Sequence, residues 1–469
     1  MANEDHKLHI AMFPWLAFGH IIPYLELAKL LAGKGHKISF ISTPKNIDRL
    51  PKLPPNIAPL VTFVKLPLPQ VDNLPEDAEA TSDLPFNKVS HLKLAHDGLQ
   101  EPMTRFLQSA DPDWILYDFS LYWLPPIARN LGIPNAFFSI FNAAMVSYVK
   151  PTLPSLDFHD DLTKLEDFTA PPKWVPFPTT ESFRFFEVLR IFDSLAGAES
   201  DISDLARAEM VVRGCDAVLV RGCYEFEPEW LRMLEDIHVK PVLPVGELPT
   251  TANETDEETD TWRHTKQWLD KQERGSVVYV AFGSEAKPSQ DELTEIALGL
   301  ELSKLPFFWV LKTRRGQSDP DPIALPDGFE ERTKGRGFIW TSWAPQLKIL
   351  SHDSVGGFLT HSGWTSVVEA IQFEKALILL AFLAEQGINA RILEEKKIGY
   401  LIPRNERDGS FTRESVAESV RLVMVEEEGQ VYRDKVKEMK GLFGDSGIQE
   451  RYVDNLLRHL QSRTRVTVK

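Results

Sequence analysis

Residues 355–371 read VGGFLTHSGWTSVVEAI, and this stretch indicates the class of fold that the chain adopts. An apolar run, Val355 to Leu359, leads into a turn that contains Gly363, and a helix-like pattern starts at Trp364. A strand that passes through a short turn into a helix is the repeating unit of α/β proteins with a parallel sheet. The turn also gathers a histidine, a tryptophan and two hydroxyl side chains, which suggests a binding site.

The same alternation of strands and helices recurs on both sides of this stretch. We expect strands over 8–15, 38–42, 114–117, 135–139, 276–282, 307–312, 337–340 and 355–360, and helices from about 20 to 32 and over 127–131, 290–302, 346–350 and 364–373. A charged helical segment is expected over 431–460. This order predicts an α/β fold with two doubly wound, Rossmann-like halves, each with a parallel sheet covered by helices.

A change of composition separates the two halves. Residues 249–261, PTTANETDEETDT, are acidic and nearly free of apolar side chains, which is typical of a linker. We therefore expect an N-terminal domain over 1–248 and a C-terminal domain over 262–447. Two Pro-rich excursions, 66–85 and 151–183, interrupt the first half, and we interpret them as walls of a ligand cleft. Ligands of such sheets bind beyond the carboxyl ends of the strands.

Bulk composition restricts the partners. The chain has 469 residues, 43% of them apolar, and a net charge of -16, which argues against nucleic acid or an anionic membrane as the main partner. Cys215 and Cys223 provide neither metal-ligand spacing nor a disulfide framework. The start, MANEDHK, has no apolar signal segment, and the longest apolar run, 376–384, is too short to span a bilayer. We expect a cytoplasmic globular protein.

Two residues of the first half are candidates for acid–base chemistry. His20 follows the first expected strand at the start of a helix, where a positive helix end would keep its ring neutral, as a general base requires. Asp118 follows the apolar run 114–117 and could orient and charge-pair that ring. A capping or packed histidine, and an aspartate that caps the next helix, are the alternatives.

The opening turn has the features of a nucleotide site. Free amides at the start of the helix, with the hydroxyls of Thr365 and Ser366, form an anion cradle to which His361 adds a donor. Glu369 is better suited to a sugar diol than to phosphate. An ordinary capped turn is the alternative. Elsewhere, Trp343 offers a flat face for a base, and residues 385–386, an acid and an amide at a strand end, suit sugar hydroxyls. A core tryptophan and a solvated turn are the alternatives.

Taken together, residues 343–386 resemble the signature box of plant UDP-sugar-dependent glycosyltransferases. The matching motifs are WAPQ at 343–346, HSGW at 361–364, Ser366, Glu369 and EQ at 385–386, supported by FGHIIP at 18–23, Asp118 and FGS at 282–284. The resemblance covers essentially the whole chain. It implies the two-domain GT-B architecture, in which we expect a C-terminal helix at about 448–465 to pack back on the N-terminal domain.

The resemblance also implies a role for each matching residue. It implies that uracil is held by Trp343 and Ala344, ribose by Gln346 and Glu369, the diphosphate by His361, Ser366 and Ser284, and the donor sugar by the backbone near Trp364 with Glu385 and Gln386. His20 would deprotonate the acceptor hydroxyl and Asp118 would steady it. The implied reaction is a single displacement with inversion, without metal or cofactor, because helix-end amides stabilise the leaving UDP. Asp111–Asp113 and Asp319–Asp321, which look like DxD metal motifs, are interpreted as loop residues.

Three positions depart from the family pattern, and a narrower resemblance is visible. Thr365 stands where Asn is usual, Ser362 where Cys is common and Ala381 where Pro is usual, so donor preference stays open. The stretches 13–43, 74–81 and 361–370 are similar to the branch that adds glucose or rhamnose to a sugar already attached to a flavonoid, saponin or other terpenoid. The acceptor would then be a hydrophobic glycoside, in a cleft lined by Trp15, Phe18, Phe119, Phe138 and Met145. We expect a monomer.

Other functions fit the sequence less well. Transfer directly to an aglycone hydroxyl is the alternative within the family. A nucleotide-sugar epimerase or phosphorylase-like protein is disfavoured by Trp343 and the EQ pair. An NAD-dependent oxidoreductase would need G-x-G-x-x-G after the first strand, where the chain reads AFGHII. A catalytically inactive UDP-sugar binder is disfavoured by the presence of both His20 and Asp118.

Overall fold

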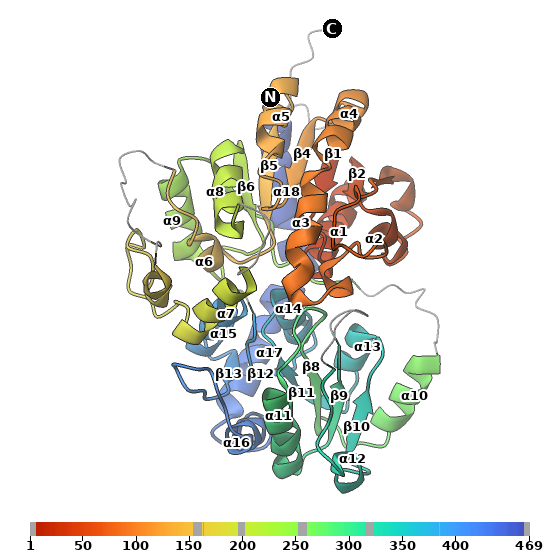
Figure 1. Cartoon of the computed structure of the whole chain (residues 1–469), viewed down its shortest axis with the longest axis vertical. Coiled ribbons are helices and arrows are strands. Elements are labelled where there is room, and N and C mark those ends of the chain that lie inside the picture. The colour runs from red at the N-terminus through yellow and green to blue at the C-terminus, as the bar shows by residue number, and fades with distance from the viewer. Residues whose placement is uncertain are drawn as a thin grey trace.

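The computed structural model describes residues 6–152, 162, 164–195, 202–251, 260–314, 322–383 and 385–463, and these form two halves, each built on a parallel sheet (Figure 1). The first sheet has the order β3-β2-β1-β4-β5-β6-β7, with strands His9–Phe13, Lys37–Ser42, Val61–Lys65, Trp114–Tyr117, Asn135–Ser139, Ala217–Val220 and Val242–Pro244 as β1 to β7. The second has the order β10-β9-β8-β11-β12-β13, with strands Val277–Ala281, Phe307–Val310, Gly337–Trp340, Val355–Thr360, Ala376–Leu379 and Gly399–Leu401 as β8 to β13.

Helices connect the strands in both halves. Those of the first half are α1 Phe18–Gly33, α2 Pro44–Asp48, α3 Val89–Asp97, α4 Gln100–Ala110, α5 Leu124–Leu131, α6 Ala143–Val146, α7 Phe185–Leu195, α8 Asp204–Gly214 and α9 Pro228–His238, with four short 3₁₀ turns at Ala58–Leu60, Thr81–Asp83, Phe86–Lys88 and Leu165–Thr169. Those that follow are α10 Asp260–Leu269, α11 Gln290–Ser303, α12 Phe329–Arg332, α13 Gln346–Leu350, α14 Trp364–Gln372, α15 Gln386–Glu395, α16 Arg413–Met424, α17 Gln430–Gly444 and α18 Ser446–Arg463.

The strand orders confirm the predicted fold class of two doubly wound Rossmann-like halves. In each sheet the order reverses beside the first strand, between β1 and β4 and between β8 and β11. A crevice opens at such a switch point, beyond the carboxyl ends of the strands, because the connections on its two sides lead to opposite faces of the sheet. The chain that follows β1, β4, β8 and β11 is therefore placed to form a site.

The central strands are buried on both faces, which explains their uninterrupted apolar runs. In β1, Ile10 and Met12 pack on one face with α1 and α18, while Ala11 and Phe13 pack on the other. Apolar residues at every position stabilise a strand that helices cover on both sides. The expected strand over 8–15 ends earlier, at Phe13, because the Trp15 amide donates to the Asp118 carboxylate instead of the sheet.

The C-terminal part differs from the single helical segment expected over 431–460. It forms two helices, α17 and α18, because Asp445 between them has an extended backbone. Helix α18 lies against the seven-stranded half (Figure 1). Leu456 and Leu460 join the core around β1, and Trp114 Nε1 donates to the Leu460 carbonyl oxygen at 3.0 Å. In the described residues, no helix is long and apolar enough to cross a membrane.

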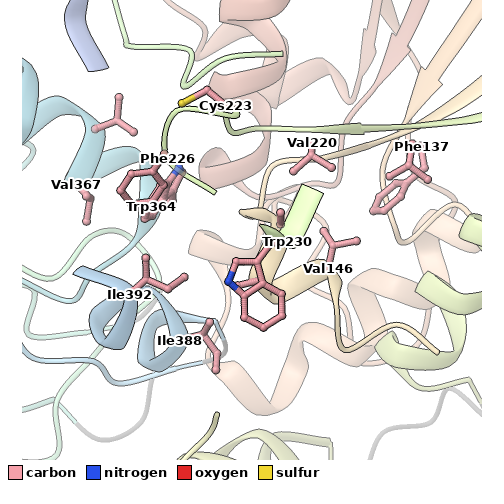
Figure 2. Close-up of a cluster of buried hydrophobic side chains, with 14 of the residues drawn as sticks. Phe137, Val146, Val220, Cys223, Phe226, Trp230, Trp364, Val367, Ile388 and Ile392 are labelled. Atoms are coloured by element: carbon pink, nitrogen blue, oxygen red, sulfur yellow. The ribbon is translucent and has the colours of Figure 1, made fainter. Parts of the chain in front are cut away.

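An apolar contact joins the two halves. Figure 2 shows Trp364 of the second half beside Phe226 of the first, with ring centroids 5.6 Å apart. Phe443 of α17 packs against both rings. The two halves therefore share a buried cluster next to α14. Of the expected linker 249–261, residues 252–259 lie outside the described part of the chain.

Candidate active site

His20 and Asp118 lie side by side at the carboxyl end of the seven-stranded sheet. His20 is in the first turn of α1, after β1, and Asp118 follows β4, the neighbour of β1. His20 Nδ1 lies 2.7 Å from Asp118 Oδ2. This bond fixes the ring orientation and leaves Nε2 as the nitrogen that can take a proton from a substrate.

Asp118 organises the turn around it instead of capping the next helix. Its Oδ2 also accepts the Trp15 amide at 3.0 Å, and its Oδ1 accepts the Phe119 amide at 2.8 Å. Helix α5 begins at Leu124 behind the N-cap residue Trp123. The alternative that Asp118 is a helix cap is therefore wrong, and its carboxylate is held in place for His20.

The surroundings of His20 raise its pKa. Burial is the largest single effect and lowers this pKa, since only 9% of the residue is exposed. The charge and hydrogen bond of Asp118, together with the charges of Glu385 and Glu285, outweigh burial. The helix N-terminus was expected to keep the His20 ring neutral. This expectation is corrected, because the nearby carboxylates raise the pKa of the ring. Glu385 and Glu285 come from the second half, so both halves contribute to the site.

His361 directly follows β11, and its ring fills the space beside two glycines. A Cβ atom at Gly283 or Gly363 would lie 2.7 Å or 2.4 Å from His361 Nε2, so side chains are excluded at both positions. Burial lowers the pKa of His361 to about 4. The ring is therefore neutral near pH 7 and can donate one hydrogen bond.

The first turn of α14 has no side-chain cap. Ser362 has a left-handed backbone with φ of 67°, and Gly363, the N-cap residue, provides no capping hydrogen bond. The first turn also contains no acidic residue. Amides at such a helix start favour an anion, as predicted for this turn.

Gln346 and Glu369 form one polar network. Gln346 Nε2 donates to Glu369 Oε2 at 2.7 Å and to Ser366 Oγ at 3.2 Å. Thr250 Oγ1, from the segment that joins the halves, donates to Glu369 Oε1 at 2.7 Å. Burial raises the pKa of Glu369, although both hydrogen bonds lower it. The structure thus brings together the residues expected at the ribose and adds Thr250, which no motif indicated.

Trp343 is exposed at the surface after β10. Its exposed fraction is 74%, so the alternative of a core tryptophan is wrong. Trp340 Nε1 donates to the Trp343 carbonyl oxygen at 3.0 Å, which holds the backbone at Trp343 and at Ala344, the next residue. The indole face is accessible to a stacked base.

Glu385 and Gln386 stand at the start of α15. Glu385 is the N-cap residue, and its charge acts on His20 across the boundary between the halves. Gln386 Oε1 accepts the amides of Phe382 and Leu383, each at 3.0 Å. This oxygen therefore shapes the loop before α15.

Trp364 and Thr365 turn toward the first half. Trp364 Nε1 donates to Glu247 Oε2 at 3.0 Å, and Arg221 Nη1 donates to Thr365 Oγ1 at 2.7 Å. Sequence reasoning missed Arg221 and Glu247 because neither belongs to a motif. The available signal was an arginine directly after the buried apolar run of β6.

Ser284 lies after β8, where the first Pro-rich excursion meets the second half. Its hydroxyl donates to Glu285 Oε1 at 3.4 Å, and Thr81 Oγ1 of the excursion donates to the same oxygen at 2.7 Å. A pocket of about 450 Å³ opens between the two halves. The first half lines it with Lys45, Arg49, Pro75, Asp77, Ser82 and Asp83, and the second half lines it with Lys312, Thr313, Arg314 and Thr341. The excursion thus lines a cleft. In the second excursion, 153–161 and 163 lie outside the described residues.

Two of the five residues expected to line the acceptor cleft, Phe138 and Trp15, are buried in the core instead. Phe138 is fully buried, and its ring packs on Tyr24 of α1 with centroids 4.6 Å apart. Side chains alternate between the two faces of β5, and the Phe138 side chain points into the core. Phe18, Phe119 and Met145 are partly exposed, and the Phe119 ring lies 5.7 Å from that of His20. Trp15 is buried against His96.

Of the two DxD-like stretches, only 111–113 lies within the described residues. Asp111 ends α4 in a left-handed conformation, and Asp113 Oδ2 accepts the His9 amide at 2.7 Å, so both lie at the amino end of β4, opposite Asp118. Residues 319–321 lie outside the described part. In the described residues, no group of three or more His, Cys, Asp or Glu side chains is arranged to hold a metal.

Comparison with known proteins gives concordant matches. Residues 208–450 match the family model "UDP-glucoronosyl and UDP-glucosyl transferase". The chain is 58% identical to UDP-glycosyltransferase 91A1 of Arabidopsis thaliana, over 98% of this chain and 97% of the relative, and 43% identical to soyasaponin III rhamnosyltransferase of Glycine max, over 98% and 96%. The structure of UGT73P12 of Glycyrrhiza uralensis with glycyrrhetinic acid 3-O-monoglucuronide has a TM-score of 0.75 and 25% identity, over 97% of this chain and 96% of that one.

Proposed function

The chain belongs to the family of UDP-glucuronosyl and UDP-glucosyl transferases, and from this membership we propose that it transfers glucose or rhamnose to a hydroxyl of a sugar already attached to a flavonoid, saponin or diterpenoid. Membership makes it a UDP-sugar-dependent hexosyltransferase of the GT-B fold. The glycoside acceptor is supported by two similar proteins, one named for transfer of rhamnose to a saponin and one solved with a glucuronide.

The His20–Asp118 pair is the observation that carries the mechanism. Its 2.7 Å bond lies at the switch point of the first sheet. The charge of Glu385 acts on the same ring, and Glu385 belongs to the signature box, residues 343–386, which we call the donor box from here on. His20 Nε2 takes the proton of the acceptor hydroxyl, and the oxygen attacks the anomeric carbon. The bond from that carbon to the diphosphate breaks, and its electron pair leaves with UDP. Attack from the side opposite UDP inverts the configuration.

Donor recognition is proposed to follow the order of the box. Trp343 stacks on uracil beside the Ala344 backbone, and the Gln346–Glu369 network meets the ribose. The first turn of α14, with His361, Ser366 and Ser284, faces the diphosphate, and residues 385–386 read the sugar. Amides of a helix start stabilise the charge that develops on UDP, so we propose that no metal or cofactor is needed. EDTA should then leave the rate unchanged, and a loss of activity that Mg²⁺ restores would contradict this.

We further propose that the protein acts as a cytoplasmic monomer. Both cysteines are free and buried, as suits a reducing compartment, and the net charge of -16 disfavours nucleic acid and anionic membranes as partners.

The test is a matrix of donors and acceptors. UDP-glucose and UDP-rhamnose are each incubated with flavonoid and saponin monoglycosides and with the matching aglycones, and UDP release and product mass are measured. We expect a product one hexose or one deoxyhexose heavier than a glycoside. Transfer only to aglycones would favour direct aglycone glycosylation, and UDP binding without transfer to any acceptor would favour an inactive binder.

His20→Ala is the control within this matrix. Loss of the base should lower kcat by roughly 10²- to 10⁴-fold and leave UDP affinity unchanged. Full turnover by the variant would remove His20 from the mechanism.

A further inference from the structure

Arg221 is a fully buried arginine of the first half that reaches the donor box of the second. It follows β6, and its Nε and Nη2 donate to the carbonyl oxygens of Glu247 and Leu248 at 2.8 Å and 3.2 Å. Its Nη1 donates to Thr365 Oγ1 at 2.7 Å. Two donors thus anchor the guanidinium to its own half, and the third holds a residue of α14.

Glu247 holds the neighbouring residue of α14. Its Oε2 accepts Trp364 Nε1 at 3.0 Å, so two consecutive residues at the start of the helix are tied to the first half. We call Arg221, Glu247, Trp364 and Thr365 the α14 clasp. The two contacts of the clasp join residues that are far apart in the sequence: Arg221 and Thr365 are separated by 144 positions, and Glu247 and Trp364 by 117.

The start of α14 beside the clasp is open to an anion. Burial lowers the pKa of Arg221 to about 10, opposed by the charges of Glu247, Glu369 and Glu26, so the guanidinium stays positive near pH 7. The first turn of α14 has neither a side-chain cap nor an acidic residue. The charge of the Glu247 carboxylate offsets that of the guanidinium, and the uncapped amides at the start of α14 remain available to an anion.

We propose that Arg221 is a positioning residue for the UDP-sugar: through Thr365 it holds the first turn of α14 where its amides meet the donor diphosphate, and it couples donor binding to the pairing of the two halves. This inference rests on the proposed function. It also gives a reason for threonine at position 365, since an asparagine carboxamide is longer and could not occupy the same 2.7 Å contact with Arg221 unless one side chain moved.

The test separates donor positioning from stability. Thr365→Val keeps the shape of the side chain and removes the hydroxyl that Arg221 contacts. We expect the donor KM and the Kd for UDP to rise about tenfold, because a hydrogen bond to a charged group is lost, while the acceptor KM changes by less than about twofold. Thr365→Asn should weaken UDP in the same direction. An unchanged donor KM and UDP Kd in Thr365→Val would overturn the proposal.

Two further variants make the test specific. Thr333→Val removes another buried threonine hydrogen bond, 2.8 Å to the Phe329 carbonyl oxygen, at the amino end of β10 and away from the donor box. It should leave the UDP Kd unchanged. Arg221→Met and the double variant Arg221→Met/Thr365→Val should have the same UDP Kd, because both lack the same contact between Arg221 and Thr365. A further loss of UDP affinity in the double variant would contradict the pairing.

The outcome is independent of whether transfer itself is found. If the wild type binds UDP but transfers no sugar, the proposed function fails while the UDP Kd still reports on the clasp. If the wild type transfers sugar and Thr365→Val binds UDP normally, only the clasp is refuted. A fall in melting temperature with unchanged UDP affinity would assign the clasp a purely structural role and overturn the inference.

Discussion

At the scale of single residues, the charge state of His20 governs the proposed chemistry. The carboxylate of Asp118 raises the pKa of the ring against the opposing effect of burial. The base form predominates above that pKa, so activity should rise with pH through it. A base with a raised pKa also binds the acceptor proton more strongly.

Asp118→Asn tests this relation. Removal of the carboxylate charge should shift the rising limb of the kcat/KM profile to lower pH and lower the plateau, because the ring loses both its charge partner and its orientation. Asp113→Asn is the matched control: Asp113 also accepts a backbone amide, but at the opposite end of β4, and its profile should match the wild type. A rising limb that stays in place or moves to higher pH in Asp118→Asn would contradict the assignment.

Trp343 allows a second test at this scale. An exposed tryptophan contributes little to folding, so Trp343→Ala should leave the melting temperature close to that of the wild type. Loss of one base–aromatic stack costs about 1–3 kcal/mol, so the donor KM should rise roughly 5- to 150-fold. Isothermal titration with UDP measures the effect directly. Unchanged UDP affinity would show that uracil does not stack there.

At the scale of elements, the placement of α15 depends on α7. Arg391 of α15 pairs with Glu187 of α7 through two contacts of 3.2 Å and 2.6 Å, and both side chains are about 90% buried, with exposures of 9% and 10%. A Cβ atom at Gly387 would lie 2.3 Å from Glu187 Oε1, so the two helices approach closely there. Because α15 begins at Gln386, this pair also holds the part of the box expected to read the donor sugar.

Arg391→Met should destabilise the protein strongly. It leaves Glu187 buried without its partner, which costs about 3–5 kcal/mol. Lys440→Met breaks a pair with Glu374 in which both side chains are largely exposed, and it should cost at most about 1 kcal/mol. Urea unfolding of both variants measures the difference. Equal stabilities would show that the α7–α15 pair does not hold the helices together.

At the scale of the whole molecule, the last described helix, α18, packs on the half that contains β1. Helix α18 supplies Leu456 and Leu460 to the core around β1, and its residues Glu450 and Asp454 face Lys34 at the end of α1. Along the sequence, the second half therefore lies between two segments that both pack in the first half. Unfolding of the seven-stranded half should involve α18.

Leu460→Ala should weaken the packing of α18 on the seven-stranded half. Truncation of a fully buried leucine costs about 2–5 kcal/mol through lost burial and the cavity that remains. Arg458→Ala, on the exposed side of the same helix, serves as control and should have little effect. Thermal unfolding followed by tryptophan fluorescence includes Trp114, whose indole donates to Leu460. A wild-type midpoint for Leu460→Ala would show that α18 contributes little to this half.

Much of the fold could be predicted because its signals are local. Strands 114–117, 135–139, 337–340 and 355–360 were predicted with the bounds that the structure has, since each is an apolar run that ends at a polar or turn residue. Errors arose where a tertiary contact overrides the pattern. The first strand ends early at the Asp118 carboxylate, and Phe138 faces the core although it stands near a strand end.

By itself, the sequence determined the two doubly wound sheets and the donor box. Periodicity and a contiguous motif encode both, and each needs only neighbours along the chain. Only the tertiary structure decided the raised pKa of His20 and the contact of Arg221 with Thr365. These depend on side chains 98 and 144 positions apart, and the strength of such interactions is set by burial, which a sequence does not display.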